Sequence, residues 1–185
     1  MVGFILQPTL RLLYQNGGTW FFTVVTFNRV EVFRNDDLVA LLNDCFQLVM
    51  RSHPFTIEAM VVLPDHLHTI WTLPDGDSDF SIRWNLVKGN FSRQFGKQLE
   101  ALSASRLKKR ERAIWQRRFW EHLVRDSDDF NRLCDYIHYN PVKHGLAESP
   151  WAWPWSSFRH CVTLGWYEPD WGASEPGAIA GMNLE

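Results

Sequence analysis

The spacing of apolar residues along the chain predicts alternating strands and helices. Residues 20–27 (WFFTVVTF) are β-branched and aromatic, a composition typical of a buried strand. Apolar residues then recur at helical spacing over 38–49, after the capping sequence Asn35-Asp36-Asp37. This first helix is expected to end near Ser52, because Pro54 follows and disfavours helical backbone before it.

A second group of elements follows this helix. Residues 55–63 and 67–73 are expected to be strands joined by a tight turn at Pro64-Asp65. A loop comes next, and Ser81 is expected to cap a second helix that runs toward Leu102.

The third group completes the pattern. Residues 114–124 contain alternating bulky side chains and predict a strand, and Asp126-Ser127-Asp128-Asp129 caps a third helix that should end close to Pro141. The resulting order is β-α-β-β-α-β-α. It indicates an α+β sandwich of ferredoxin-like or RRM-like type, with an antiparallel sheet and helices packed on one face.

Composition divides the chain after the third helix. Residues 1–147 carry the predicted sandwich as one domain, whereas residues 148–185 are rich in tryptophan and proline. We expect this C-terminal extension to pack on the core, with most of its tryptophans filling space and some stacking on unpaired bases. The last residues, from about 175, are expected to fray.

Composition also excludes several classes of protein. Of the 185 residues, 45% are hydrophobic and 15% are aromatic, which excludes disorder for most of the chain. No apolar run approaches the roughly 18 residues of a membrane span, and the start of the sequence lacks the features of a signal peptide. Three cysteines without paired spacing suit a reduced protein. We therefore expect a cytoplasmic protein with no membrane partner.

The net charge of −2 conceals an uneven distribution. Between Arg83 and Arg118 the chain has eleven basic and two acidic residues, a charge of +9, and the remainder carries −11. A basic segment of this density can bind a polyanion through its phosphates. The alternative is a helix face whose charges are only solvated. The scarcity of acidic residues in the segment favours a nucleic-acid partner.

Two histidines two residues apart form the first candidate site. His66 and His68 lie on a predicted strand, so their side chains point to the same face while Leu67 points to the other. Two neutral imidazoles placed in this way can converge on one divalent metal ion, with a third ligand from elsewhere. The alternative is a pair of strand histidines that make ordinary hydrogen bonds.

Residues of the third helix form the second candidate site. Tyr136 and Asn140 are separated by one helical turn and share a face. An amide oxygen can complete a metal site begun by two histidines, and a phenol beside it can attack a polarised phosphodiester. The alternative is a helix whose tyrosines pack on the sheet and whose Asn140 precedes the helix-ending Pro141.

Together these residues resemble the HUH single-tyrosine transposases, and most closely the REP-associated tyrosine transposases, where REP denotes repetitive extragenic palindromes. The matching segments are VVLPDHLHTIWTLP (61–74), IWQRRFWEHLVRD (114–126), DYIHYNPVKHGL (135–146) and WPWSSF (153–158), in the family's order and spacing. The resemblance implies an RRM-like catalytic domain over residues 1–147, a divalent metal ion (Mg²⁺ or Mn²⁺), and cleavage of single-stranded DNA. It also implies a covalent 5′-phosphotyrosine intermediate and a free 3′-hydroxyl.

The resemblance implies roles for individual residues. His66 and His68 would bind the metal ion, Asn140 would be its third ligand, and Tyr136 would be the nucleophile. Tyr139 is the less suitable tyrosine, because its spacing to Asn140 differs from the family's.

The leading hypothesis is an endonuclease and strand transferase that acts on REP hairpins and the adjacent single strand as a monomer, with a dimer as the alternative. Seven basic residues are expected to contact the DNA backbone, namely Arg93, Lys108, Lys109, Arg110, Arg112, Arg117 and Arg118. Glu121 and His122 also match the family, and their role stays open between a structural contact, a DNA contact and proton transfer.

Two other functions are compatible with these patterns. A domesticated protein could bind REP hairpins without cutting them, although it would not need all four site residues. A metal-dependent phosphodiesterase could use the histidine pair and a bound water, with no covalent intermediate. A covalent protein–DNA adduct that disappears with Tyr136→Phe distinguishes the transferase from both.

Overall fold

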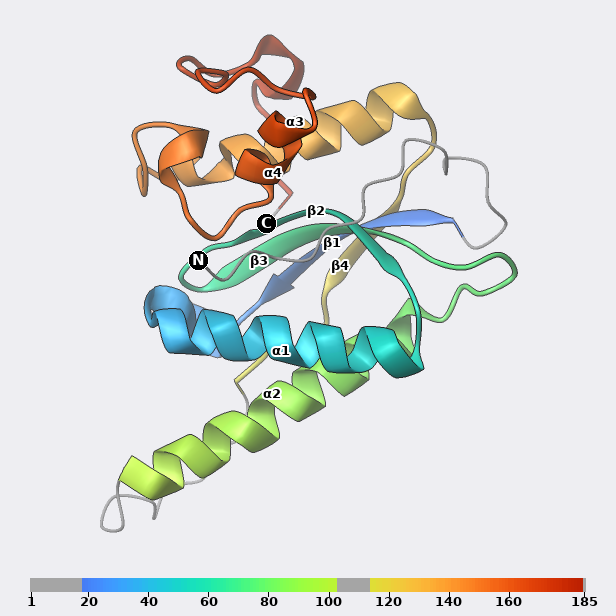
Figure 1. Cartoon of the computed structure of the whole chain (residues 1–185), viewed down its shortest axis with the longest axis vertical. Helices are drawn as coiled ribbons and strands as arrows, with labels where there is room; N and C mark the ends of the chain where they lie inside the picture. Colours follow the sequence, from blue (N-terminus) through green and yellow to red (C-terminus); the bar gives the residue numbers. More distant parts are fainter. Residues whose placement is uncertain (1–17, 103–113, 185) are drawn as a thin grey trace.

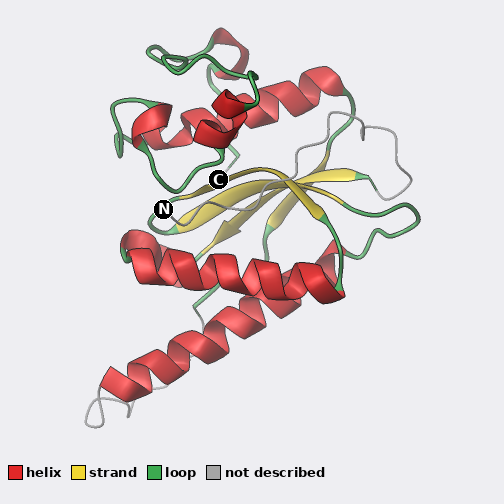
Figure 2. Cartoon of the chain, in the orientation of Figure 1, coloured by secondary structure: helices red, strands yellow, loops and turns green. Residues whose placement is uncertain are grey.

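A four-stranded antiparallel sheet forms the centre of the computed structural model, which describes residues 18–102 and 114–184 (Figures 1 and 2). The strands lie in the order β2-β3-β1-β4. Their bounds are β1 Thr19–Val25, β2 Thr56–Val62, β3 His66–Thr72 and β4 Trp120–Leu123. The helices are α1 Asp36–Ser52, α2 Phe80–Leu102, α3 Ser127–Lys143 and α4 Phe158–Thr163, with short 3₁₀ turns η1 Phe27–Arg29, η2 Val32–Arg34, η3 Pro150–Ala152 and η4 Gly177–Ile179. This is the predicted element order and the predicted α+β class.

Helices cover both faces of the sheet. Helices α1 and α2 lie against one face, and α3 with the C-terminal elements lies against the other (Figure 1). The helices were expected on one face, which describes α1 and α2 but not α3. The reason is visible in β1, where the neighbouring residues Phe21 and Phe22 are both fully buried although they point to opposite faces. A sheet whose two faces are apolar needs a cover on each.

The core on the α1–α2 side is aromatic. Trp71 of β3 and Trp84 of α2 stack with ring centroids 4.2 Å apart, and Phe22 packs against both. Across the sheet, Phe21 and Ile70 pack with Ile137 of α3 in a second cluster. Because β3 lies between these two clusters, all seven of its positions are buried. Its histidines are therefore held in a rigid, central strand.

The register of the strands positions the candidate site. In the β1–β3 pair, Val25 is opposite His66 and Thr23 is opposite His68, and in the β1–β4 pair Thr23 is also opposite Trp120. Directly opposed residues point to the same face of an antiparallel sheet. His68, Thr23 and Trp120 therefore form one row across the face that α3 covers.

The first helix and the hairpin that follows it match the sequence prediction closely. Helix α1 begins at Asp36 because the side chain of Asn35 accepts a hydrogen bond from the backbone N–H of Asp37 at 2.8 Å. It ends at Ser52, before Pro54. Strands β2 and β3 are joined at Pro64-Asp65, where Leu63 N–H donates to the carbonyl of His66 at 2.8 Å.

The starts of two later elements differ from the prediction. Helix α2 begins at Phe80 and is capped by the Asp79 carboxylate, which accepts from Ile82 N–H at 2.9 Å, so Ser81 is not the cap. Strand β4 covers only 120–123 of the predicted 114–124. A continuous strand would place Arg117 on the buried face between Trp115 and Phe119, and an unpaired guanidinium cannot be buried there.

Helix α3 extends beyond the proline that was expected to end it. Pro141 lies inside the helix, two residues before its last residue Lys143, and His144 N–H still donates to the carbonyl of Asn140 at 3.0 Å. Proline removes one hydrogen bond, but its fixed φ is compatible with the final helical turn. The candidate metal ligand Asn140 therefore keeps regular helical geometry.

The tryptophan-rich extension packs against the sheet and α1. Val62 N–H donates to Trp155 O and Ser157 N–H to Met60 O, both at 2.8 Å, so this segment covers the outer edge of β2. The indole of Trp153 donates to the carbonyl of Val62 at 2.9 Å. Farther on, Ile179 is 3% exposed, and the fraying expected from about residue 175 stays a prediction. None of the helices in the described ranges has both the length and the apolar character needed to cross a bilayer.

Candidate active site

Two histidines lie side by side on β3. His66 begins the strand and His68 follows two residues later, and both rings point toward α3. Their ring centroids are 5.0 Å apart with the planes at 81°, and the two residues are only 2% and 0% exposed. The pair can therefore present two imidazole nitrogens to one ion.

Hydrogen bonds fix one nitrogen of each ring. Asp65 Oδ1 lies 2.6 Å from Nδ1 of His66, and Thr23 Oγ1 lies 2.9 Å from Nδ1 of His68. Nε2 is then the nitrogen that each ring can offer to a metal ion, because the partner at Nδ1 orients the ligand. Burial, followed by the charges of His66 and His144, lowers the pKa of His68 well below its usual value, so this ring is neutral. A neutral ring has a lone pair to donate.

The Asp65 carboxylate is itself held by two partners. Burial acts to raise its pKa, but the hydrogen bonds and charges of His66 and Arg29 outweigh burial and lower it. Arg29 Nη1 lies 3.0 Å from the second oxygen of this carboxylate. Asp65 therefore stays ionised and fixes the orientation of His66.

Helix α3 carries Tyr136 over the same face of the sheet. The ring of Tyr136 lies 5.2 Å from that of His68 and 6.2 Å from that of Phe21, measured between centroids. The helix starts at this place because Asp126 caps it, accepting from the backbone N–H of Asp129 at 2.8 Å. Its apolar residue Ile137 then packs on the sheet, which turns Tyr136 toward the histidine pair.

The position of Asn140 follows from its neighbours along the helix. Tyr136, Asn140 and His144 are each one turn apart and share a face. Tyr136 contacts His68, and His144 contacts His66 with ring centroids 5.4 Å apart. Asn140 thus lies between these two contacts and faces the histidine pair.

The donor atoms of this site suit a divalent cation. Nε2 of His68 and both amide atoms of Asn140 are buried without a hydrogen-bond partner among the described residues. Such atoms are costly to bury unless a ligand completes them. In the described ranges no group of three or more His, Cys, Asp or Glu side chains could hold a metal ion. A site on the histidine pair therefore needs a ligand of another kind, which the Asn140 oxygen can supply.

Two further residues beside the site were not singled out in the sequence. Lys143 Nζ lies 4.9 Å from the centre of the Tyr136 ring, and His144 stands against His66. Helical spacing could have found both, since they lie seven and eight residues after Tyr136, or about two turns. Lys143 brings a positive charge next to the phenol.

The C-terminal tail contacts the same residues. The backbone N–H of Leu184 donates to the hydroxyl of Tyr136 at 3.2 Å, and Thr23 Oγ1 donates to the carbonyl of Leu184 at 2.6 Å. Lys143 Nζ donates to the carbonyl of Met182 at 2.8 Å. The tail is thus attached to both the tyrosine and the lysine of the site.

Three residues that the sequence also singled out, Tyr139, Glu121 and His122, do not join the histidine pair, Tyr136 and Asn140. Tyr139 is directed toward the C-terminal extension, where its ring centroid is 6.5 Å from that of Trp171. Glu121 is opposite Phe22 and therefore points to the α1–α2 side of the sheet. His122 faces the α3 side, and its Nε2 lies 2.7 Å from Asp129 Oδ2.

The basic segment divides between surface and core. Arg93, Arg117 and Arg118 are exposed. Arg83 is 2% exposed and forms an ion pair with Asp77, and burial lowers the pKa of Lys88 to about 8. The remaining residues expected to contact DNA lie outside the described residues: Lys108, Lys109, Arg110 and Arg112. The charge of +9 therefore overstates the cationic surface.

Residues 19–140 match a protein-family model described as "Transposase IS200 like". This match spans the sheet, both candidate metal-binding histidines, and α3 as far as Asn140. The matched region ends before the tryptophan-rich extension.

Relatives extend the similarity over nearly the whole chain. A REP-associated tyrosine transposase of Escherichia coli K12 is 42% identical over 174 residues, which cover 94% of this chain and 96% of the relative. A Haemophilus influenzae relative described as the same kind of transposase is 39% identical over 91% of this chain and 95% of its own. A solved REP-associated tyrosine transposase bound to a REP hairpin is 40% identical and superposes with a TM-score of 0.72, covering 93% of this chain and 96% of that one.

Proposed function

This chain belongs to the IS200-like transposase family, and within it to the REP-associated tyrosine transposases, and from that premise we propose that it cleaves and rejoins single-stranded DNA beside a REP hairpin. The observation that carries this proposal is the meeting of Tyr136 with His68, whose ring centroids are 5.2 Å apart, on the face that Asn140 shares. The similar structure bound to a REP hairpin supports the choice of substrate.

Tyr136 is the proposed nucleophile. Its hydroxyl oxygen attacks the phosphorus of the scissile phosphodiester, and a bond forms between that oxygen and phosphorus as the bond from phosphorus to the 3′-oxygen breaks. The phenol loses its proton, and the departing oxygen gains one to become a free 3′-hydroxyl. The 5′-phosphate stays on Tyr136, so a second 3′-hydroxyl can later attack it and rejoin the strands.

His66, His68 and Asn140 would hold a divalent ion such as Mg²⁺ or Mn²⁺. When bound, the ion neutralises negative charge on the phosphate and polarises its oxygens. Asp65 and Thr23 support this role because they fix the two imidazoles. Lys143, 4.9 Å from the centre of the Tyr136 ring, adds positive charge where the phenolic oxygen becomes negative.

The experiment uses an oligonucleotide with a REP hairpin, an unpaired flank and a label. The protein is incubated with it and Mn²⁺, and covalent adducts are separated on a denaturing gel. The wild type should form an adduct and release a free 3′-hydroxyl, and Tyr136→Phe should form none. Tyr139→Phe is the matched control, since its ring packs against Trp171 and the adduct should persist.

The other outcomes identify the competing functions. Cleavage that survives Tyr136→Phe would establish a phosphodiesterase that uses a bound water. Hairpin binding by the wild type with no cleavage in the presence of Mn²⁺ would establish a DNA-binding protein. Addition of EDTA should abolish the adduct while hairpin affinity remains, because the metal ion serves the reaction rather than the duplex contacts.

A further inference from the structure

The edge strand β4 exposes a large aromatic side chain beside the candidate active site. Trp120 is 43% exposed, although it is the largest type of side chain and lies on a face of the sheet that is otherwise covered. Its ring meets that of Phe21 edge-on, with centroids 5.7 Å apart. Phe21 is already fully buried. Trp120 covers Phe21 on one side, and the rest of this residue, 43% of its surface, is open to solvent.

One aromatic ring, that of Phe21, lies between Trp120 and the proposed nucleophile Tyr136. Phe21 contacts Trp120 on one side and Tyr136 on the other, with the second pair of centroids 6.2 Å apart. Trp120 is also opposite Thr23, whose hydroxyl holds His68. A DNA strand whose phosphate lies at Tyr136 must continue past the side chains that surround the site. Trp120 is one of these side chains, and it is aromatic and exposed.

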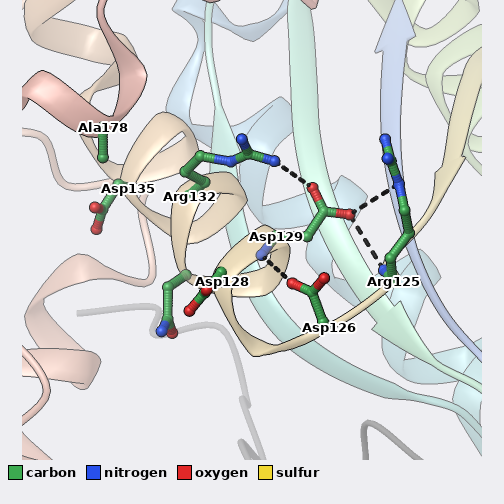
Figure 3. Close-up of a pocket in the computed structure, with 8 residues that line it drawn as sticks. Arg125, Asp126, Asp128, Asp129, Arg132, Asp135 and Ala178 are labelled. Atoms are coloured by element: carbon green, nitrogen blue, oxygen red, sulfur yellow. Dashed lines mark hydrogen bonds and ion pairs between the residues drawn. The ribbon is translucent and has the colours of Figure 1, made fainter.

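The orientation of the indole is supported from α3. Trp120 and His122 are parallel, with an interplanar angle of 1° and centroids 5.9 Å apart. His122 is fixed in turn by Asp129, whose carboxylate oxygen lies 2.7 Å from Nε2. Asp129 is buried and also accepts from the backbone N–H of Arg125 at 3.2 Å and from Arg132 Nη2 at 2.9 Å (Figure 3). This network joins β4 to the first turn of α3 and keeps both rings parallel.

The cavity next to the network, which Trp120 does not line, is a poor site for a phosphate because of its charge. The cavity on α3 beside Asp129 is lined by two arginines and by four carboxylates, Asp126, Asp128, Asp129 and Asp135 (Figure 3). A phosphate in this cavity would meet more negative than positive charge. The faces of Trp120 carry no charge, and an unpaired base can stack on them whatever its sequence.

We propose that Trp120, held parallel to His122 by Asp129, is a stacking site for one unpaired base of the strand that Tyr136 cleaves. This inference rests on the proposed function for the identity of the strand. The occupant is a nucleobase of single-stranded DNA next to the scissile phosphate. Stacking there holds the flexible flank so that the phosphate is presented to the tyrosine.

The test measures binding in the Tyr136→Phe background, so that no cleavage is needed. A series of hairpin oligonucleotides carries a single abasic residue at each position of the unpaired flank in turn. For one position, the abasic residue should weaken binding by about 5- to 100-fold. In Trp120→Ala, the intact oligonucleotide should bind as weakly, and the same abasic residue should cause no further loss, because the two changes remove one contact.

Two variants make the result specific. Trp120→Phe keeps an aromatic face and should retain most of the affinity. Trp151→Ala removes a tryptophan of equal exposure, 43%, on the C-terminal 3₁₀ turn η3 and should leave every abasic effect unchanged. Melting curves of all variants establish that they are folded.

The outcomes separate this inference from the proposed function. If every abasic effect persists in Trp120→Ala, Trp120 does not bind a base and the inference is overturned, whatever the cleavage assay gives. If the coupling is present but the wild type forms no covalent adduct, the stacking site stands and the proposed transferase fails. The inference would also be overturned if an abasic residue lowered the affinity equally at every flank position, since no single base would then be the one that stacks on Trp120.

Discussion

A polar atom that is buried without a hydrogen-bond partner or a bound ligand destabilises the folded state, and Asn140 carries two such atoms. Neither of its amide atoms has a partner among the described residues, although the residue is fully buried. Burial of unsatisfied polar groups costs about 1–3 kcal/mol in other proteins. The buried amide is therefore consistent with the proposed role of Asn140 as a metal ligand.

Replacement of Asn140 by leucine should therefore separate stability from function. We expect Asn140→Leu to raise the free energy of unfolding in EDTA by about 1–2 kcal/mol, because a side chain of similar volume removes the unsatisfied amide. The wild type should gain stability when Mn²⁺ is added, and the variant should not. Melting curves with EDTA and with Mn²⁺ measure both effects. A variant that is less stable in EDTA would show that the amide has a structural partner.

Asp129 should make the protein sensitive to acid. Burial raises the pKa of its carboxyl, but the hydrogen bonds from His122, Arg125 and Arg132 outweigh burial and lower it. A carboxyl with a lowered pKa in the folded state stabilises the protein above its unfolded pKa of about 3.9, and this contribution is lost as pH falls through the folded value. Asp129→Asn should cost about 1–3 kcal/mol at pH 7 and much less at pH 3.

Urea unfolding at both pH values measures this difference. Asp128→Asn is the matched control, because Asp128 lies in the same first turn of α3 but is exposed, and its effect should be small at either pH. A cost for Asp129→Asn that is equal at pH 7 and pH 3 would show that the charge of the carboxylate is not what stabilises the network.

At the scale of elements, the C-terminal tail forms hydrogen bonds with two side chains of α3, Tyr136 and Lys143. The hydroxyl of Tyr136 accepts a hydrogen bond from Leu184 N–H, and Lys143 donates to the carbonyl of Met182. An incoming phosphate needs the space around this hydroxyl. In the proposed reaction the tail would therefore have to leave Tyr136 first, and three hydrogen bonds, one of them from Thr23, oppose its departure.

Removal of the tail should accelerate adduct formation. A variant that lacks residues 183–185 loses both backbone contacts of Leu184, and we expect its rate of adduct formation to rise by about 3- to 30-fold, the factor that corresponds to roughly 0.5–2 kcal/mol of hydrogen bonding. Single-turnover gels measure this rate. Hairpin affinity should stay within about twofold, and the same deletion in Tyr136→Phe should give no adduct. An unchanged or slower rate would show that the tail does not restrict the tyrosine.

The elements that were predicted well are those whose signals are local. Asn35 caps α1 and Pro54 follows its end, so both limits could be read from neighbouring residues. The length of β4 could not, because it depends on which face of the sheet α2 covers and hence on the cost of burying Arg117. The same limit applies to the site. The spacing of His66 and His68 was visible, whereas the contacts of the tail and of Lys143 depend on how distant segments pack.

At the scale of the whole molecule, the fold separates two tasks. Helices α1 and α2 close one face of the sheet around an aromatic core (Figure 1). The other face carries the histidine pair and Trp120, and Tyr136 of α3 packs over it. Sequence order could not reveal this division, because the α3 face and the α1–α2 face are both buried in β1 and β3. The charge pattern was also only partly informative, since Arg83 forms an ion pair with Asp77 and Lys88 lies over the rings of Trp115 and Phe119.

The identity of the nucleophile is the central claim, and mapping the covalent adduct tests it most directly. After reaction with a hairpin oligonucleotide and digestion of the DNA to a single phosphonucleotide, trypsin should release residues 133–143, a peptide that ends at Lys143 and contains both tyrosines. Fragmentation in a mass spectrometer then assigns the added mass to one residue. We predict that it lies on Tyr136. Added mass on Tyr139, or cleavage of the DNA with no modified peptide, would contradict the account.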